Sequence, residues 1–179
     1  MEDKNNNDND YLFEPMFKMT TDEQGNLFAL FVRQPFASML ADGRKTIEIR
    51  SQPTDIRGDI LICSTKSHDY PNAQGGCTIG IVELYDIKKT DELTDEEWEQ
   101  TRTRKFDRRQ LNKGYAWMFK NPRRVIEYPV IQPKNKIAYI KFNEDNLFVY
   151  PKIVKFDKPV GKKRLDEFFG SIGYNNPKG

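Results

Sequence analysis

The sequence predicts an α+β fold in which a small, mostly antiparallel, barrel-like β-sheet carries two or three helices on its outside. Three observations lead to this prediction. Several short segments are rich in Leu, Ile, Val and Phe, or alternate apolar with polar side chains, as strands do. Two further segments carry the residues that begin helices. Neither an internal repeat nor a phosphate-binding glycine loop is present, which excludes solenoid and nucleotide-loop folds.

The first strand and the first helix follow each other directly. Leu27 to Arg33 is rich in Leu, Phe and Val without regular alternation, which is typical of a strand buried on both faces. Pro35 suits the first position of a helix, and Gly43 can adopt the left-handed conformation that ends one. The apolar residues of this short helix repeat at i, i+3 and i+4: Phe36, Met39 and Leu40.

A second strand begins after the helix, and its polar face carries two charges. Ile47 and Ile49 alternate with Glu48 and Arg50, so the two charged side chains share one face of the strand. Strict alternation would put Lys45 on the opposite face. Lys45 therefore joins them only if it lies in the turn before the strand becomes regular.

The remaining elements are predicted from alternation and capping. Thr94 and Glu97 form a capping box, and Leu93 and Trp98 are spaced as a hydrophobic staple, so a helix begins here and runs into a basic segment that ends near Arg109. Further strands are predicted at 60–65, 78–86, 115–119, 125–131, 136–142 and 152–156, and a further helix around 165–172. The loop from Lys66 to Cys77 is long for a hairpin and is expected to fold over a cleft.

The chain is long enough for one domain with extensions. We expect a disordered or extended lead over 1–24, one domain over 25–142, and an extension over 143–179 that docks on the domain. No apolar run approaches the roughly 20 residues that span a bilayer, and the first residues do not resemble a signal peptide. These features predict a soluble cytoplasmic protein without membrane contacts, and we favour a monomer.

The net charge and the cysteines limit the classes of function that this chain can have. The 29 Lys and Arg against 27 Asp and Glu give a net charge of +2, which is too low for a non-specific nucleic-acid binder, so any such binding must use a local patch. With one histidine, His68, and two distant cysteines, Cys63 and Cys77, the chain lacks the ligand spacing of a zinc site. We predict no metal and no cofactor, and we interpret both cysteines as core residues.

Gly43, Lys45, Glu48 and Arg50, after a Pro-aromatic-Ala helix start, resemble the Gly-x-Lys-x-x-Glu-x-Arg pattern of the ASCH domain, a branch of the PUA-like small barrels. Other segments are similar to the same family in the same order, from about Leu27 to Phe142. They are Arg57-Gly58-Asp59-Ile60-Leu61-Ile62, Ile79-Gly80-Ile81-Val82, Tyr115-Ala116-Trp117 and Asn121-Pro122-Arg123.

The resemblance implies a binding module for RNA or a modified nucleotide or nucleoside, held in a cleft between the motif helix and the barrel. Tyr115 and Trp117 are expected near this cleft, where an aromatic face can stack on a base, although alternation equally allows that they point into the core. Arg123 is expected to meet a phosphate. The expected ligand-binding set is Arg33, Lys45, Glu48, Arg50, Tyr115, Trp117 and Arg123.

Two alternatives remain open. One branch of the family is similar to amidohydrolases that deacetylate N4-acetylcytidine with a motif lysine and a threonine three residues later, but Glu48 stands at the threonine position here. An enzyme acting on a nucleoside amide, or a ribonuclease, would use Lys45 as charge stabiliser or base and Glu48 as acid or base. The other alternative is a protein-interaction domain whose motif is only structural.

Overall fold

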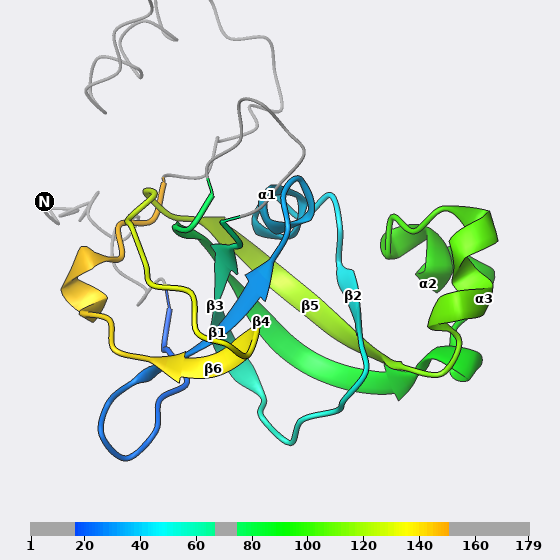
Figure 1. Ribbon diagram of the computed structural model, residues 1–179, viewed down its shortest axis with the longest axis horizontal. Helices are drawn as coiled ribbons and strands as arrows, with labels where there is room; N and C mark the ends of the chain where they lie inside the picture. The colour runs from blue at the N-terminus through cyan, green and yellow to red at the C-terminus, as the bar shows by residue number, and fades with distance from the viewer. Residues whose placement is uncertain (1–16, 67–74, 151–179) are drawn as a thin grey trace, which may run out of the picture.

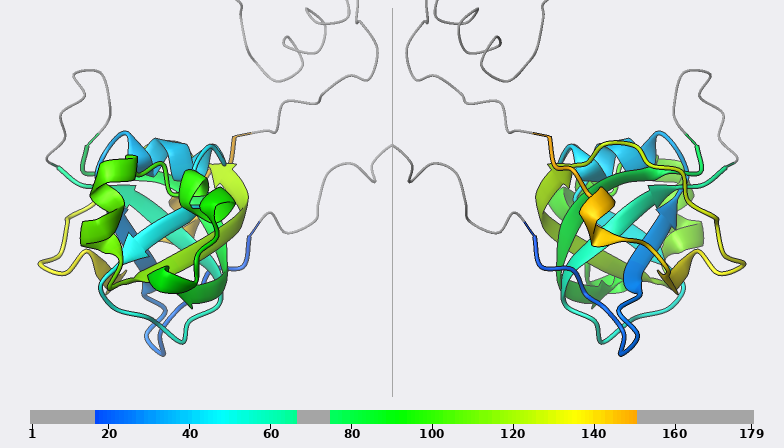
Figure 2. Two further views of the ribbon diagram at one scale, coloured as in Figure 1. Left: turned by 90° about the vertical axis from the view of Figure 1, so that its right-hand side faces the viewer. Right: turned by 90° about the vertical axis from the view of Figure 1, so that its left-hand side faces the viewer.

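The computed structural model describes residues 17–66 and 75–150. Within them, a six-stranded mixed sheet curls into a half-barrel, with its strands in the order β2-β5-β4-β3-β1-β6 (Figures 1 and 2). All neighbouring strands are antiparallel except β1 and β3, which are parallel. The strands are β1 Leu27–Val32, β2 Ile47–Arg50, β3 Gly58–Ser64, β4 Thr78–Lys89, β5 Tyr115–Arg124 and β6 Ile137–Ile140.

Short helices lie between the strands and outside the sheet, and Figure 1 shows α1 above the sheet and α2 and α3 at its right-hand side. The α-helices are α1 Phe36–Ala41, α2 Asp95–Gln100 and α3 Arg108–Leu111. The 3₁₀ turns are η1 Thr90–Glu92, η2 Lys105–Asp107 and η3 Glu144–Asn146. This arrangement confirms the predicted fold class, an α+β domain on a small, mostly antiparallel, barrel-like sheet.

β1 and β3 lie inside the sheet and are buried on both faces, as the first of them was predicted to be. Phe28, Leu30 and Val32 pack with α1 in one hydrophobic cluster. Leu27, Ala29 and Phe31, which point to the other face, pack in a second cluster. The residues of β3 divide between the same two clusters. Because no face of these strands meets water, their sequences are nearly continuous apolar runs.

The buried face of α1 differs from the predicted one. Phe36 is 37% exposed, and the residues that face the core are Ala37, Leu40 and Ala41. The reason is the close approach of α1 to β4. A Cβ atom added to Gly80 would lie 2.4 Å from the Cβ of Ala41, so only small side chains fit between helix and strand. Of the predicted stripe, Leu40 is buried as expected, whereas Ala37 and Ala41 face the core in place of Phe36 and Met39.

Gly43 ends α1 in the left-handed conformation that the sequence predicted. Its φ is +77°, and its N–H donates to the carbonyl of Leu40 at 3.2 Å. An added Cβ would also lie 2.9 Å from Cγ of Pro122 on β5. Both the backbone conformation and the contact with β5 therefore require glycine at this corner.

The segment between β4 and β5 begins with the predicted capping box. The Thr94 hydroxyl accepts from the Glu97 N–H at 3.2 Å, and the Glu97 carboxylate accepts from the Thr94 N–H at 3.0 Å. The helix, however, does not continue through the basic residues. Arg102 has a φ of 59°, which turns the chain after α2, and a new helix begins only at Arg108. The stretch to Arg109 is thus two short helices and not one.

Two predicted strands differ most from the observed ones. β5 was expected to end at Phe119 but runs to Arg124, and irregular register with β4 accommodates Asn121, which has a φ of 49°. The strand predicted over 125–131 is not a regular strand, because the structure shows only isolated bridges from Val125 and Pro129 there. Proline lacks the N–H that a continued ladder needs.

Several sequence predictions lie outside the described residues. They are the lead up to residue 16, most of the loop between β3 and β4 with His68, the strand at 152–156 and the helix around 165–172. The domain boundaries at 24 and 142 and the docking of the C-terminal extension stay predictions.

Replacing Thr94 by Ala should remove the acceptor for the Glu97 N–H and lower the free energy of unfolding by about 1 kcal/mol. Thr94→Ser keeps a hydroxyl at the cap and should unfold like the wild type. Urea unfolding followed by circular dichroism measures both variants. If Thr94→Ala unfolded at the same urea concentration as Thr94→Ser, the cap would contribute nothing to stability.

Candidate functional site

The charged side chains of the motif meet at the corner between α1 and β2. The Lys45 Nζ lies 3.0 Å from Oε2 of Glu48, and the Arg50 Nε lies 3.9 Å from Oε1 of the same carboxylate. Lys45 lies in the turn before β2, as its convergence with the other two requires. The three side chains therefore meet, but the cleft predicted between the motif helix and the barrel stays a prediction. That these residues bind a ligand stays a prediction.

Lys45 is almost completely buried, with only 4% of its side chain exposed. Besides Glu48, its Nζ donates to the carbonyl of Thr101 at 2.5 Å and lies 5.4 Å from the centre of the Phe36 ring. Two more bonds join the same segments, from the Thr46 N–H to the Gln100 carbonyl and from the Arg102 Nε to the Arg44 carbonyl. The ammonium thus fastens the motif corner to the end of α2.

Arg50 reaches from β2, at one edge of the sheet, to β1. Its Nη2 donates to the carbonyl of Phe31 at 2.9 Å. Its Nε is buried without a hydrogen bond, because the Glu48 oxygen at 3.9 Å is too far for one. Burial lowers the pKa of the Arg50 guanidinium, and Glu48 opposes that shift. The group nevertheless stays charged and ties the two sides of the half-barrel together.

The two aromatic residues predicted near the cleft differ in exposure. Trp117 is fully buried in the core, and its Nε1 donates to the carbonyl of Gln52 at 3.0 Å. Its ring has no open face, so the expectation that it stacks on a base was wrong and the core alternative was right. Tyr115 is partly buried against the same core and lies opposite Arg50 in the β2–β5 register. Its role in ligand binding stays a prediction.

Arg123 does not join the motif residues. Its guanidinium holds both oxygens of Asp59 on β3, at 3.0 and 2.6 Å, and only 10% of its side chain is exposed. The Lys18 N–H also donates to the same carboxylate at 2.8 Å. Such a two-pronged, largely buried pair is a tie between strands. The expected phosphate contact at Arg123 is therefore not supported by its surroundings.

Arg33 lines a hollow of about 500 Å³ at one edge of the sheet. The remaining lining residues are Thr65, Lys66, Ile131, Gln132 and Lys136. This lining holds three cations and no carboxylate. A second hollow, of about 440 Å³, is mainly apolar and lies around Tyr128 and Phe142. Of the predicted ligand-binding residues, only Arg33 lines either hollow.

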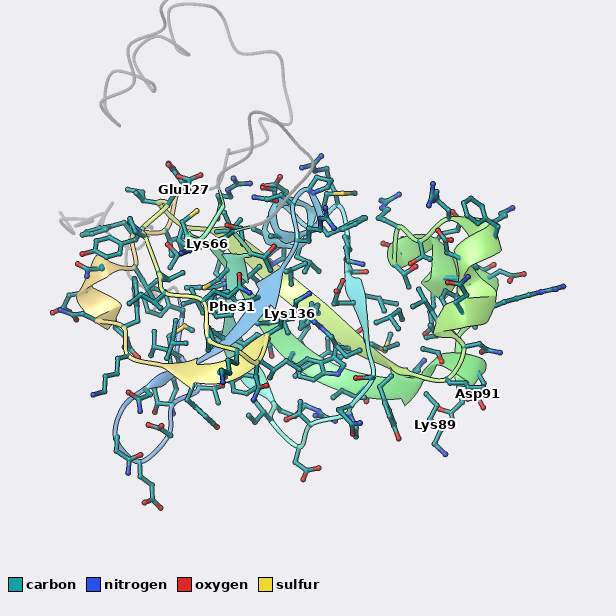
Figure 3. The ribbon with its side chains drawn as sticks, viewed as in Figure 1. Phe31, Lys66, Lys89, Asp91, Glu127 and Lys136 are labelled. Carbon is teal, nitrogen blue, oxygen red and sulfur yellow. The ribbon has the colours of Figure 1, made fainter. Side chains whose placement is uncertain are left out.

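The topology explains why these cations gather. Because β1 and β3 are parallel, Arg33 after β1 and Lys66 after β3 emerge at the same edge of the sheet. β6 is antiparallel to β1, so Lys136 just before β6 lies at that edge as well. Figure 3 shows Lys66 and Lys136 on either side of the Phe31 label. The sequence analysis missed both lysines, since their only signal is a position beside strand ends whose pairing was unknown.

The motif and the basic hollow meet at Phe31. The Phe31 carbonyl accepts from Arg50, and its N–H donates to the carbonyl of Lys136 at 2.7 Å. The charged corner therefore positions the end of β1, from which Arg33 extends into the hollow. Through this link, the buried motif residues fix the position of the strand end that carries Arg33, while the three cations of the hollow stay at the surface.

The described residues offer neither a metal site nor a membrane helix. No group of three or more His, Cys, Asp or Glu in this part of the chain is arranged to hold a metal ion. No helix within it is long and apolar enough to cross a membrane. Cys63 and Cys77 are buried free thiols, and burial raises the pKa of both, which suits the predicted role as core residues.

A curled, mostly antiparallel sheet with a charged corner after its first helix defines a PUA-like half-barrel domain. The family model described as the ASCH domain matches residues 30–136, which is more than half of the chain. The chain therefore belongs to the ASCH domain family.

Solved structures share this fold. A crystal structure of ASCH from Zymomonas mobilis has a TM-score of 0.51 at 15% identity, covering 64% of this chain and 87% of that one. A serine-to-alanine variant of the same protein gives a TM-score of 0.52 at 16% identity, with the same coverage. Identities this low show the fold alone. Comparison with curated protein sequences found no match.

Replacing Lys45 by Met should leave Glu48 and the Thr101 carbonyl without their shared donor and should lower the free energy of unfolding by about 3 kcal/mol. Arg44→Met is a matched control, because that neighbouring side chain is 59% exposed and its ion pair with Asp42 should contribute less than about 1 kcal/mol. Urea unfolding compares the two. Equal losses in both variants would contradict a supporting role for Lys45.

Proposed function

We propose that this ASCH domain binds single-stranded RNA or a phosphate-bearing nucleotide in the hollow lined by Arg33, Lys66 and Lys136. RNA binding is a general property of the family to which the chain belongs. The observation that carries the proposal is the composition of the hollow. It has a volume of about 500 Å³, within the usual range of ligand sites, and three cations without a carboxylate line it.

The other lining groups suit a nucleotide as well as its phosphate. The Gln132 Oε1 accepts from the Lys66 N–H at 3.1 Å, which orients the amide so that its NH₂ can donate to a base or a ribose. Ile131 is 90% exposed and offers an apolar edge for a base or sugar. Cations for phosphate beside neutral donors and an apolar edge are the contacts that nucleotide binding requires.

The motif residues fix the position of the strand end that carries Arg33. Lys45 and Glu48 hold Arg50, Arg50 holds the Phe31 carbonyl, and the strand that contains Phe31 presents Arg33 to the hollow. The motif side chains are too buried to supply most of the ligand contacts, since 4%, 17% and 15% of their side chains are exposed in sequence order. Their main contribution is therefore to fix the geometry of the surface cations.

Binding fits the motif better than hydrolysis does. The Lys45 ammonium is covered and engaged by two oxygen acceptors, so it does not face a substrate in this structure. Glu48 lies between two cations, Lys45 and Arg50, and it stands where the amidohydrolase pattern has a threonine. A hydroxyl nucleophile is thus absent from the motif position that would supply it.

Binding can be measured as fluorescence anisotropy of a labelled single-stranded RNA over a series of salt concentrations. The three cations of the hollow should together contribute about 2 to the slope of log Kd against log salt. Each of Arg33→Gln, Lys66→Gln and Lys136→Gln should weaken binding and lower that slope by about 0.7.

Lys89→Gln is the matched control for this experiment. Lys89 is an exposed cation at the end of β4, and Figure 3 places it at the opposite end of the domain from Lys66. Its loss changes the net charge equally but removes no group from the hollow. If all four variants had the same affinity and salt slope, the hollow would not be the binding site.

Purified protein should convert neither N4-acetylcytidine to cytidine nor the RNA probe to fragments. Chromatography of the nucleoside and a denaturing gel of the RNA test this absence of turnover. Turnover of either substrate by the wild type, lost in Glu48→Gln, would overturn the binding proposal in favour of an enzyme.

A further inference from the structure

Phe106 carries the most exposed aromatic ring in the described part of the chain, and the fold does not use it. It lies in η2, between α2 and α3, and is 69% exposed. The Arg104 guanidinium lies 4.4 Å from the ring centre, and the Arg104 Nε donates to Asp107 at 3.0 Å. The ion pair and the cation–π contact hold the ring at the surface, where most of it stays accessible.

The surroundings of Phe106 are strongly basic. Residues 102–113 contain six Arg and Lys and a single acidic residue, Asp107. Two of these cations have carboxylate partners, since Arg104 contacts Asp107 and Arg108 contacts Glu99 at 2.9 Å. Lone exposed apolar residues are common on protein surfaces and need no explanation. An exposed ring among this many cations is instead typical of a surface that binds single-stranded nucleic acid. We call this surface the platform: bases stack on its ring, and phosphates contact its Lys or Arg side chains.

This basic segment is fastened to the motif corner. Lys45 donates to the Thr101 carbonyl, and Arg102 donates to the Arg44 carbonyl at 2.6 Å. Asp91, at the acidic start of the segment between β4 and β5, lies at the lower right of Figure 3. Arg50 connects the other side of the corner to the basic hollow through Phe31. The motif therefore lies between the hollow and the platform.

We infer that Phe106 stacks on a base of single-stranded RNA while Lys105 and Arg109 contact the flanking phosphates, so that one strand occupies both this platform and the basic hollow. This inference rests on the proposed function and extends it to a second contact region on α2–α3. Both flanking cations are exposed, so they can meet phosphates without rearrangement of the fold.

The test uses the full chain and a labelled oligouridine of about 12 nucleotides, within the site sizes of single-strand-binding domains. Phe106→Ala should raise Kd roughly five- to tenfold, which corresponds to the lower end of measured stacking contributions. Phe106→Tyr keeps the ring and should bind like the wild type. Phe148→Ala removes another exposed ring, one that is 58% exposed on the η3 side, and should leave Kd unchanged.

A duplex RNA of the same length separates stacking from a general charge effect. Its bases are paired and cannot lie on Phe106, so Phe106→Ala should leave the affinity for the duplex unchanged. Photo-crosslinking with a halogenated uridine should label the peptide that contains Phe106. Thermal unfolding should be the same for all variants, since no buried group is removed.

Each outcome separates the two proposals. If the wild type bound no RNA, both the proposed function and this inference would fail. If binding depended on Lys66 and Lys136 but Phe106→Ala behaved like Phe148→Ala, only the stacking platform would be wrong. An unchanged Kd for RNA together with an altered oligomeric state of Phe106→Ala would make the exposed ring a protein contact and would equally overturn the inference.

Discussion

The buried ammonium of Lys45 is the interaction on which the arrangement of this domain depends. A charge removed from water is costly unless it is paired and hydrogen-bonded, and Lys45 meets that condition only where Glu48 and the Thr101 carbonyl come together. The position of β2, the end of α2 and the direction of the Glu48 side chain are thereby fixed at one point. Glu48 then orients Arg50, and Arg50 fixes β1 through the Phe31 carbonyl.

The cations of this protein fall into two groups with different work. Lys45, Arg50 and Arg123 are largely buried, have defined carboxylate partners and hold strands and helices together. Others lie at the surface. The directions of the strands bring some of them together around the basic hollow, and the rest lie along the segment after α2. The net charge of +2 conceals this division, because long-range attraction of RNA would be weak while two local patches are strongly positive. We therefore expect a shallow salt dependence, set by the few cations of these patches.

Local sequence signals predicted the fold well where one short-range mechanism dominates. The Gly43 turn, the capping box at Thr94 and the fully buried β1 were all correct, because each depends on neighbours within a few residues. The buried stripe of α1 was right at Leu40 but wrong at Phe36 and Met39, because Gly80, distant in sequence, brings β4 too close for large side chains. The expected single acidic-to-basic helix was wrong because the chain turns at Arg102. Neither the close approach of β4 nor the turn at Arg102 has a signature in the local pattern.

The sequence by itself determined the family motif, its position at a helix-to-strand corner and the shared face of Glu48 and Arg50, since alternation along a strand fixes which side chains are neighbours. Tertiary structure alone decided what those charges touch. In the folded chain, Lys45 is buried against the end of α2, Arg123 pairs with Asp59, and Trp117 lies in the core. The tertiary structure also gathered Arg33, Lys66 and Lys136 around one hollow, because that proximity arises from a parallel and an antiparallel pairing of strands far apart in the chain.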